Sequence, residues 1–433
     1  MLGRLICFTT LVLLCLTFSL WTPQADFPRV PFLEFLKNIP GWLEWLALGV
    51  SMVSLAASAM ITRSKASPFQ WVAIFGLTLL ILADQHRFQP WAFQMLLLLL
   101  VFSLAQQVRY RSPVNELIAV QEPELDKAKI SSDSTSPRLL RMQLAGWLTI
   151  SIYIYSGISK LDYSFATTHG QQLISGLLMN SSNVAEWPKS VSVPLTLLMP
   201  IGEISVAVLL LVPRTQRVGY LISLGMHAAL IWAVGPWGLG HQPAVLAWNL
   251  YFIAQNGLLF ASSRELTFEA IEVDHAQKRR RDVVAQAIIA IAILFPILSP
   301  FGFYDVWPAW GLYASRPARV RCYLNEAARE KLPPRLQKYV GQPQEIFSPW
   351  NRFHLDQWSL HAHDAPIYPE DRFHVAAALA VARRYNLSGD LKVVHQSAAG
   401  WLSLERVSQE FVGVDEIQEF AADFLLNCNG RLR

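Results

Sequence analysis

The chain has 433 residues, of which 53% are hydrophobic and only 16% are charged. A soluble globular protein usually carries about 25% charged residues, so the composition excludes an ordinary soluble protein as a description of the whole chain. The formal net charge is +4, and most of the basic residues lie in loops between long apolar runs. Such loops face anionic lipid headgroups, so the charge indicates a lipid bilayer as the partner and no nucleic acid.

Nine apolar segments approach the roughly 20 residues that a bilayer-spanning helix needs. The first follows Arg4 as a signal peptide would, but Leu20–Pro23 lacks a small-residue cleavage pattern, so we interpret it as a retained helix. The sequence therefore predicts an all-α polytopic membrane helix bundle of about nine spans with a small C-terminal α+β extracytoplasmic domain. The nine segments are 5–21, 41–62, 69–83, 90–106, 139–158, 191–213, 216–235, 244–262 and 283–300.

The distribution of Lys and Arg predicts the orientation of these spans. With the N-terminus in the cytoplasm, the cytoplasmic segments hold 16 Lys and Arg residues and the opposite side holds five. An even number of spans would break this asymmetry. We therefore predict an integral protein of a bacterial cytoplasmic membrane, with a cytoplasmic N-terminus and an extracytoplasmic C-terminal domain.

Four regions follow from the same pattern. We predict an N-terminal four-helix membrane segment over 1–106, a flexible cytoplasmic linker over 107–138, a five-helix membrane core over 139–300 and the α+β domain over 301–433. The linker is rich in Ser, Pro and charge, a composition that cannot build a core. In the last region, alternating residues predict strands and apolar periodicity predicts helices. The strands are Arg319–Leu324, Phe353–Leu360 and Leu391–Gln396, and the helices are 370–385 and 414–426.

Cysteine and histidine spacing gives weak signals. Cys322 and Cys428 both fall in the C-terminal domain, where a disulfide and two free thiols remain equally open. His361 and His363 would share a face if they lay on a strand, with Asp364 and His374 as further ligands. Two histidines alone do not define a metal centre, so we predict no metal site.

Three of the ionisable residues in or beside apolar segments carry the functional hypothesis, since charge at such positions is costly and needs a partner or a role. By helix rise, Glu203 and His227 lie at a similar depth of roughly 15–16 Å in neighbouring spans. They could form a structural hydrogen bond or a pair that relays protons or contacts a cofactor, or they could fail to meet. Lys160 falls roughly 30 Å from the start of its span, at the outer surface, where it either extends its ammonium into the headgroups or is buried and serves as a base.

Several further polar residues should share the level of Lys160 and form an outer polar layer. They are Asp84, His86, Arg87, Asp162, His169 and His241, with Asn249 slightly deeper.

Residues 155–165 read Tyr-Ser-Gly-Ile-Ser-Lys-Leu-Asp-Tyr-Ser-Phe. This segment resembles the Lys-Lys-Leu-Asp segment of vitamin K-dependent γ-glutamyl carboxylase and of its bacterial relatives, the horizontally transferred transmembrane (HTTM) family. The second Lys of that motif, the family's catalytic base, aligns with Lys160, and Gly225-Met226-His227 resembles the family's His-bearing helix. The resemblance implies a quinol-dependent enzyme at the outer membrane face, with Lys160 as base, His227 as stabiliser or proton carrier and Glu203 orienting it.

The chain also departs from that family, because Ser159 replaces the first Lys and the large β-rich domain is missing. Carboxylation of peptide glutamate is therefore doubtful, and loss of catalysis stays open. The alternative is a non-catalytic redox or assembly subunit of a membrane complex, like DoxX-type or methylamine-utilisation membrane proteins. This alternative predicts an extracytoplasmic protein partner and no quinone turnover. A transporter is a third alternative, but no inverted repeat or paired broken helices point to it.

Overall fold

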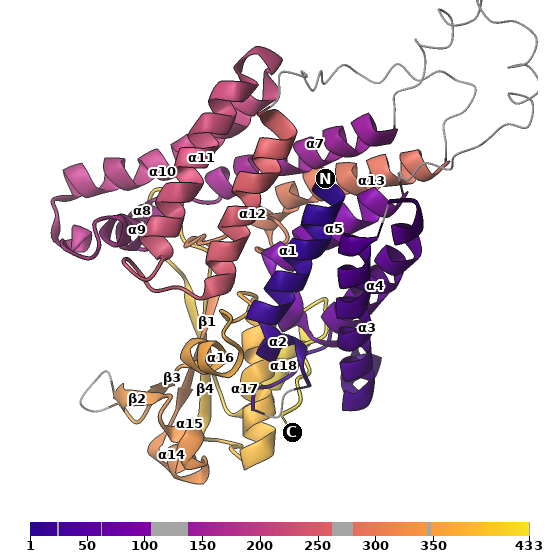
Figure 1. Cartoon of the computed structure of the whole chain (residues 1–433). Helices are drawn as coiled ribbons and strands as arrows, with labels where there is room; N and C mark the ends of the chain where they lie inside the picture. Colours follow the sequence, from indigo (N-terminus) through magenta and orange to yellow (C-terminus); the bar gives the residue numbers. More distant parts are fainter. Residues whose placement is uncertain (24–25, 62, 105–136, 262–279, 344–347, 433) are drawn as a thin grey trace, which may run out of the picture.

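The computed structural model describes residues 1–23, 26–61, 63–104, 137–261, 280–343 and 348–432 (Figure 1). The predicted linker lies outside these residues, apart from 137–138. A large helical part occupies one end of the molecule, and the C-terminal domain, drawn in orange and yellow, lies at the other end.

A helix occurs at each of the nine predicted apolar segments. Four helical stretches among the described residues are long and apolar enough to cross a membrane: Gly41–Met60, Lys189–Leu211, Pro213–Val234 and Arg280–Phe301. The mainly helical membrane architecture is therefore confirmed, whereas the count of about nine spans is not. The helices are α1 (Leu2–Leu16), α3 (Gly41–Met60), α4 (Arg63–Ala83), α5 (Pro90–Leu104), α7 (Pro137–Ile158), α10 (Lys189–Leu211), α11 (Gln216–Val234), α12 (Pro243–Phe260) and α13 (Arg280–Leu294), which continues as η5 (Phe295–Phe301).

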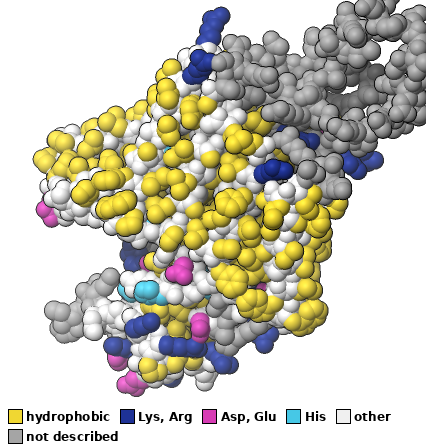
Figure 2. All heavy atoms as spheres, viewed as in Figure 1, with side chains coloured by type: hydrophobic (Ala, Val, Ile, Leu, Met, Phe, Trp, Pro, Cys, Tyr) yellow, Lys and Arg dark blue, Asp and Glu magenta, His cyan; other side chains and the backbone are white. Residues whose placement is uncertain are grey.

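The outer surface of the helical part is apolar. Hydrophobic side chains cover much of the helical part in Figure 2, and charged side chains gather over the C-terminal domain and at the opposite end of the helical part. Phe75, Leu198 and Leu221 expose 73%, 61% and 61% of their surfaces. Soluble monomers rarely expose a contiguous apolar patch of more than a few hundred Å², so this surface fits a lipid environment.

The C-terminal domain is a five-stranded antiparallel sheet of order β2-β3-β1-β4-β5 with helices packed against it. The strands Arg319–Leu324 and Leu391–Gln396 and the helices near 370–385 and 414–426 are confirmed. The strands are β1 (Arg319–Leu324), β2 (Val340–Pro343), β3 (Asn351–Phe353), β4 (Leu391–Gln396) and β5 (Ser408–Val412). The helices are α14 (Glu326–Lys331), α15 (Pro334–Gln337), α16 (Leu355–His363), α17 (Asp371–Tyr385) and α18 (Val414–Ala422).

The predicted strand Phe353–Leu360 is wrong. The strand ends at Phe353 and α16 begins at Leu355. Leu355, Trp358 and Ser359 are buried, which is the i, i+3, i+4 spacing of one helix face rather than strand alternation.

The helix also separates the two histidines that a strand would have placed together. Residues two apart on a helix point in different directions, so His361 is exposed and His363 is buried at 3%. Within the described residues no group of three or more His, Cys, Asp or Glu side chains could hold a metal ion. The sequence left open whether Cys322 and Cys428 form a disulfide. In the structure both are buried and free.

The segment between α2 (Phe18–Trp21) and α3 joins the C-terminal domain. Phe27 and Val30 belong to the hydrophobic core of that domain, and Arg29 forms an antiparallel β-bridge with Arg431. The segment that precedes α3 therefore meets the C-terminal end of the described chain, and this contact fixes the domain against the helical part.

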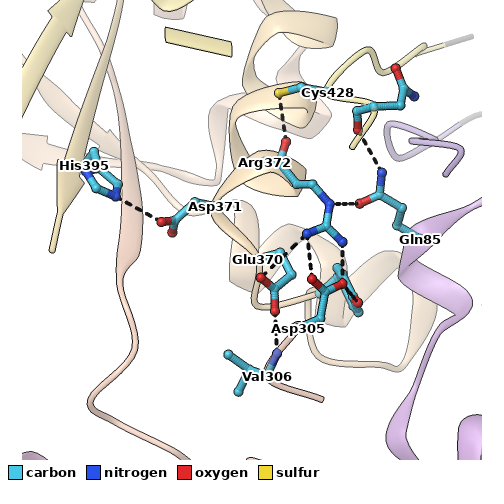
Figure 3. A network of polar contacts seen from close by, with 10 residues as sticks. Gln85, Asp305, Val306, Glu370, Asp371, Arg372, His395 and Cys428 are labelled. Atoms are coloured by element: carbon cyan, nitrogen blue, oxygen red, sulfur yellow. Dashed lines mark hydrogen bonds and ion pairs between the residues drawn. The ribbon is translucent and has the colours of Figure 1, made fainter. Parts of the chain in front are cut away.

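Arg372 on α17 forms a second attachment, shown in Figure 3. Its Nε donates to Oε1 of Gln85 at 2.9 Å, and its Nη1 donates to Oδ1 of Asp305 at 2.8 Å. The same nitrogen lies 3.7 Å from Oε2 of Glu370. Because Gln85 lies between α4 and α5 and Asp305 follows α13, this buried guanidinium ties three distant parts of the chain together.

Candidate functional site

Lys160 is buried against Glu203 between α7 and α10. Its Nζ lies 2.6 Å and 2.8 Å from the two carboxylate oxygens of Glu203 and 2.8 Å from Oγ of Ser156. Only 7% of the Lys160 side chain is exposed, so the ammonium does not extend into the headgroups. All three N–H donors of an ammonium therefore have an acceptor.

The pair forms because α7 and α10 approach closely and are offset along their axes. A Cβ at Gly157 would lie 2.9 Å from the carbonyl oxygen of Pro200, so glycine permits this approach. The short helices α8 (Tyr163–Ala166) and α9 (His169–Leu177) pack on α10 beyond the end of α7. The depth estimate left contact between Glu203 and His227 open, and in the structure the carboxylate of Glu203 is hydrogen-bonded to Lys160.

His227 on α11 belongs to a neighbouring hydrogen-bonded cluster. Its Nε2 lies 2.7 Å from the hydroxyl of Tyr153, and its Nδ1 lies 2.8 Å from Oδ1 of Asn249. The amide of Asn256 donates to the same tyrosine hydroxyl at 2.6 Å. These partners fit a neutral imidazole that donates through Nδ1 and accepts through Nε2. The ring of Phe252 stacks on this imidazole, with 4.9 Å between the ring centroids.

Both clusters line one small cavity of about 90 Å³, which we call the core cavity. Lys160, Glu203, His227 and Asn249 all contribute to its wall, together with Tyr313 from the segment after α13. The structure thus brings the three predicted catalytic residues to one place. Their chemical roles stay a prediction.

The remaining residues of the predicted outer polar layer separate into two groups. In the first group, Asp84 accepts a hydrogen bond from the backbone N–H of His86 at 3.2 Å. Nη2 of Arg87 lies 2.7 Å from Oε2 of Glu44 on α3. Arg29 also pairs with Glu44. This group stabilises the base of the C-terminal domain and lies outside the wall of the core cavity.

The second group surrounds the segment that enters the C-terminal domain. Asp162 accepts from the backbone N–H of Phe165 and begins α8. His169 Nδ1 lies 3.1 Å from the carbonyl oxygen of Tyr313, and His241 Nδ1 lies 3.0 Å from its hydroxyl. These contacts hold Tyr313 over the core cavity.

The sequence reading missed Tyr153, Ser156 and Glu44. Tyr153 and Ser156 precede Lys160 by seven and four residues, which is the spacing of one helix face, and Lys160 follows the end of α7 at Ile158. That spacing could have identified them. Glu44 is a carboxylate inside the predicted span 41–62, which could have marked it as a buried group that needs a partner.

These observations define the protein's class: a helical membrane protein with a C-terminal α+β domain and a buried polar site between its helices. Residues 139–237 match the model of a family described as methylamine utilisation protein MauE. The matched stretch is 99 of 433 residues and runs from α7 to α11, so it includes Lys160, Glu203 and His227. No curated protein and no solved structure matches the chain.

The match corrects the resemblance to the HTTM and γ-carboxylase families. The motif around Lys160 lies inside the MauE-matching stretch, and the family model that matches there is neither HTTM nor γ-carboxylase. The quinol and the carboxylase-like chemistry depended on that resemblance, and neither is carried forward.

Proposed function

We propose that this chain is a non-catalytic assembly or redox-accessory subunit of a membrane complex. In this proposal the helical part anchors the C-terminal domain at the membrane surface, where the domain binds a protein partner. The observation that carries the proposal is the saturation of Lys160, whose three donors face Glu203 and Ser156 at 2.6–2.8 Å.

A general base needs a free lone pair directed at the proton that it removes. The carboxylate of Glu203 instead matches an ammonium that already holds its protons, and the pair leaves no donor or acceptor directed into the core cavity from Lys160. This geometry favours a role in joining α7 to α10 over a role in proton abstraction.

The size of the core cavity supports the same conclusion. Sites for small molecules usually have volumes of about 300–1,000 Å³. The core cavity has about 90 Å³, which is room for a few water molecules and not for a substrate with a ring system. Similarity to MauE, whose description names utilisation of methylamine and no reaction, is compatible with an accessory role.

The orientation is part of the proposal. The excess of Lys and Arg in alternate loops supports a cytoplasmic N-terminus and an extracytoplasmic C-terminal domain of a bacterial cytoplasmic membrane protein. Fusions of alkaline phosphatase and of green fluorescent protein to the C-terminus test this. Only the phosphatase fusion should be active, and fluorescence without phosphatase activity would contradict it.

A purification experiment tests the accessory role. The full chain, solubilised in mild detergent, should co-purify with a defined protein at a fixed ratio. The double variant Lys160→Met/Glu203→Leu should keep that partner, because it replaces a self-satisfied pair by apolar packing. The proposal fails if the wild-type chain purifies without a partner. It also fails if the double variant stays folded and keeps its partner while the complex loses its activity.

A further inference from the structure

A second and larger cavity, of about 450 Å³, lies between α8–α9 and the C-terminal domain. We call it the arginine pocket, because Arg319, Arg321 and Arg352 line it. Asp356 is the one acidic residue among the described residues of its wall. The side chains that form the wall therefore carry two net positive charges, since burial lowers the pKa of both His169 and His374 and keeps them neutral at pH 7.

The strand pattern explains why the arginines face this space. Val320 and Cys322 point into the domain core, so Arg319 and Arg321 point to the other side of β1. β3 pairs with β1 only from Cys322 to Leu324. The first half of β1 is therefore open on that edge, toward α8 and α9.

These guanidinium groups differ from their neighbours in having no partner within the described part of the chain. Arg406 donates to backbone carbonyls of Ser315 and Ser397 at 2.7 Å and 2.6 Å. Arg316 lies over the ring of Trp401 at 4.1 Å. Outside the backbone pairing of β1 and β3, no hydrogen bond or ion pair joins the guanidinium group of Arg319, Arg321 or Arg352 to another described group, and the positive charges of Arg321 and Arg352 act on Arg319.

We propose that the arginine pocket binds a dianionic phosphate monoester group. Guanidinium groups bind phosphate in a bidentate manner, and two net positive charges match a phosphate monoester at pH 7 better than a singly charged carboxylate or phosphodiester. The guanidinium groups repel one another, and a bound anion would relieve this repulsion. Burial, together with Arg406, Arg321 and Arg352, lowers the pKa of Arg319 to about 10.

Two sources supply this chemistry, a lipid headgroup and a soluble phosphate compound. Calorimetric titration of the detergent-solubilised full chain with inorganic phosphate and pyrophosphate tests the soluble source. Nanodiscs containing phosphatidic acid, compared with nanodiscs of phosphatidylcholine alone, test the lipid source. Saturable binding in either arm, weakened by added salt, supports the proposal and identifies the source.

Matched variants localise the binding. Arg321→Gln and Arg352→Gln should each weaken it about tenfold or more, since each removes a charge-assisted contact. Arg384→Gln makes the same charge change on an exposed part of α17 and should leave binding unchanged. Without ligand, Arg321→Gln should unfold at the same temperature as the wild type or a higher one, because repulsion falls.

Two results would overturn the proposal. One is the absence of saturable binding in both arms. The other is binding that survives the triple variant Arg319→Gln/Arg321→Gln/Arg352→Gln while that variant unfolds cooperatively. Neither result bears on the accessory role, which the co-purification experiment tests separately.

Discussion

Breaking the ion pair between Lys160 and Glu203 should destabilise the protein strongly, whereas replacing both residues should not. In Lys160→Met the Glu203 carboxylate loses a partner at 2.6 Å while only 11% of its side chain is exposed. Removing one member of a buried pair costs about 3–5 kcal/mol, because the other charge stays buried and unpaired. Replacing both members with apolar residues of similar volume is often neutral or stabilising.

We therefore expect Lys160→Met and Glu203→Leu each to lose about 3 kcal/mol of unfolding free energy, and the double variant to lie within about 1 kcal/mol of the wild type. The total stability of a folded domain is about 5–15 kcal/mol, so either single loss is readily measured. Reversible unfolding in mixed micelles with added dodecyl sulfate, followed by circular dichroism, gives the four free energies at one pH.

Lys189→Met provides the control. It makes the same chemical change on the first residue of α10, where the side chain is exposed, and should alter stability by less than about 0.5 kcal/mol. Single losses that simply add in the double variant would refute the reasoning, because the two charges would then act independently.

Three further changes test other contacts. Gly157→Val should push α7 away from the carbonyl oxygen of Pro200 and lower stability by about 1–3 kcal/mol in the same unfolding assay, whereas Gly202→Val, with open space around it, should not. Tyr153→Phe removes the hydroxyl that contacts His227 and should cost about 1–3 kcal/mol; an unchanged unfolding curve would contradict the hydrogen bond. Burial, together with a neighbouring carboxylate, raises the pKa of Glu370 to about 8. Between pH 7 and 8 the folded protein then holds a proton that the unfolded chain has released, so the free energy of unfolding should fall as pH rises, by up to about 1.4 kcal/mol per pH unit. Glu370→Gln should flatten this slope, and an equal slope in both proteins would refute the assignment.

The positions of the membrane helices could be predicted because long apolar runs report directly on burial in lipid or in a core. The ends of β1 and β4 were predictable for a related reason, since alternation marks a sheet with one buried face. Phe353–Leu360 shows where this fails. A window of eight residues with apolar positions three and four apart fits a short helix as well as a strand, and packing against the domain core decides between them.

The partners of the polar residues could not be predicted from spacing. Lys160 and Glu203 are 43 residues apart, and their contact depends on how far α10 extends past the end of α7. Arg372 and Gln85 are 287 residues apart and meet where the segment between α4 and α5 lies against α17. Such contacts arise from the assembled fold, so the residue types were visible in the sequence and their pairing was not.

The core cavity is not the property of the MauE-matching stretch alone. Tyr313 and Leu312 line it, and both lie outside residues 139–237. Tyr313 and the nearby Trp310 have φ angles of 59° and 63°, in the left-handed region that bulky residues rarely occupy. Such strain costs about 1–3 kcal/mol per residue and persists only where surrounding contacts hold it. Here the contacts are those of Tyr313 with His169 and His241 and the burial of Trp310 against Phe93. The segment that leads into the C-terminal domain is thus held in place by the helical part, and Tyr313 joins this segment to the wall of the core cavity.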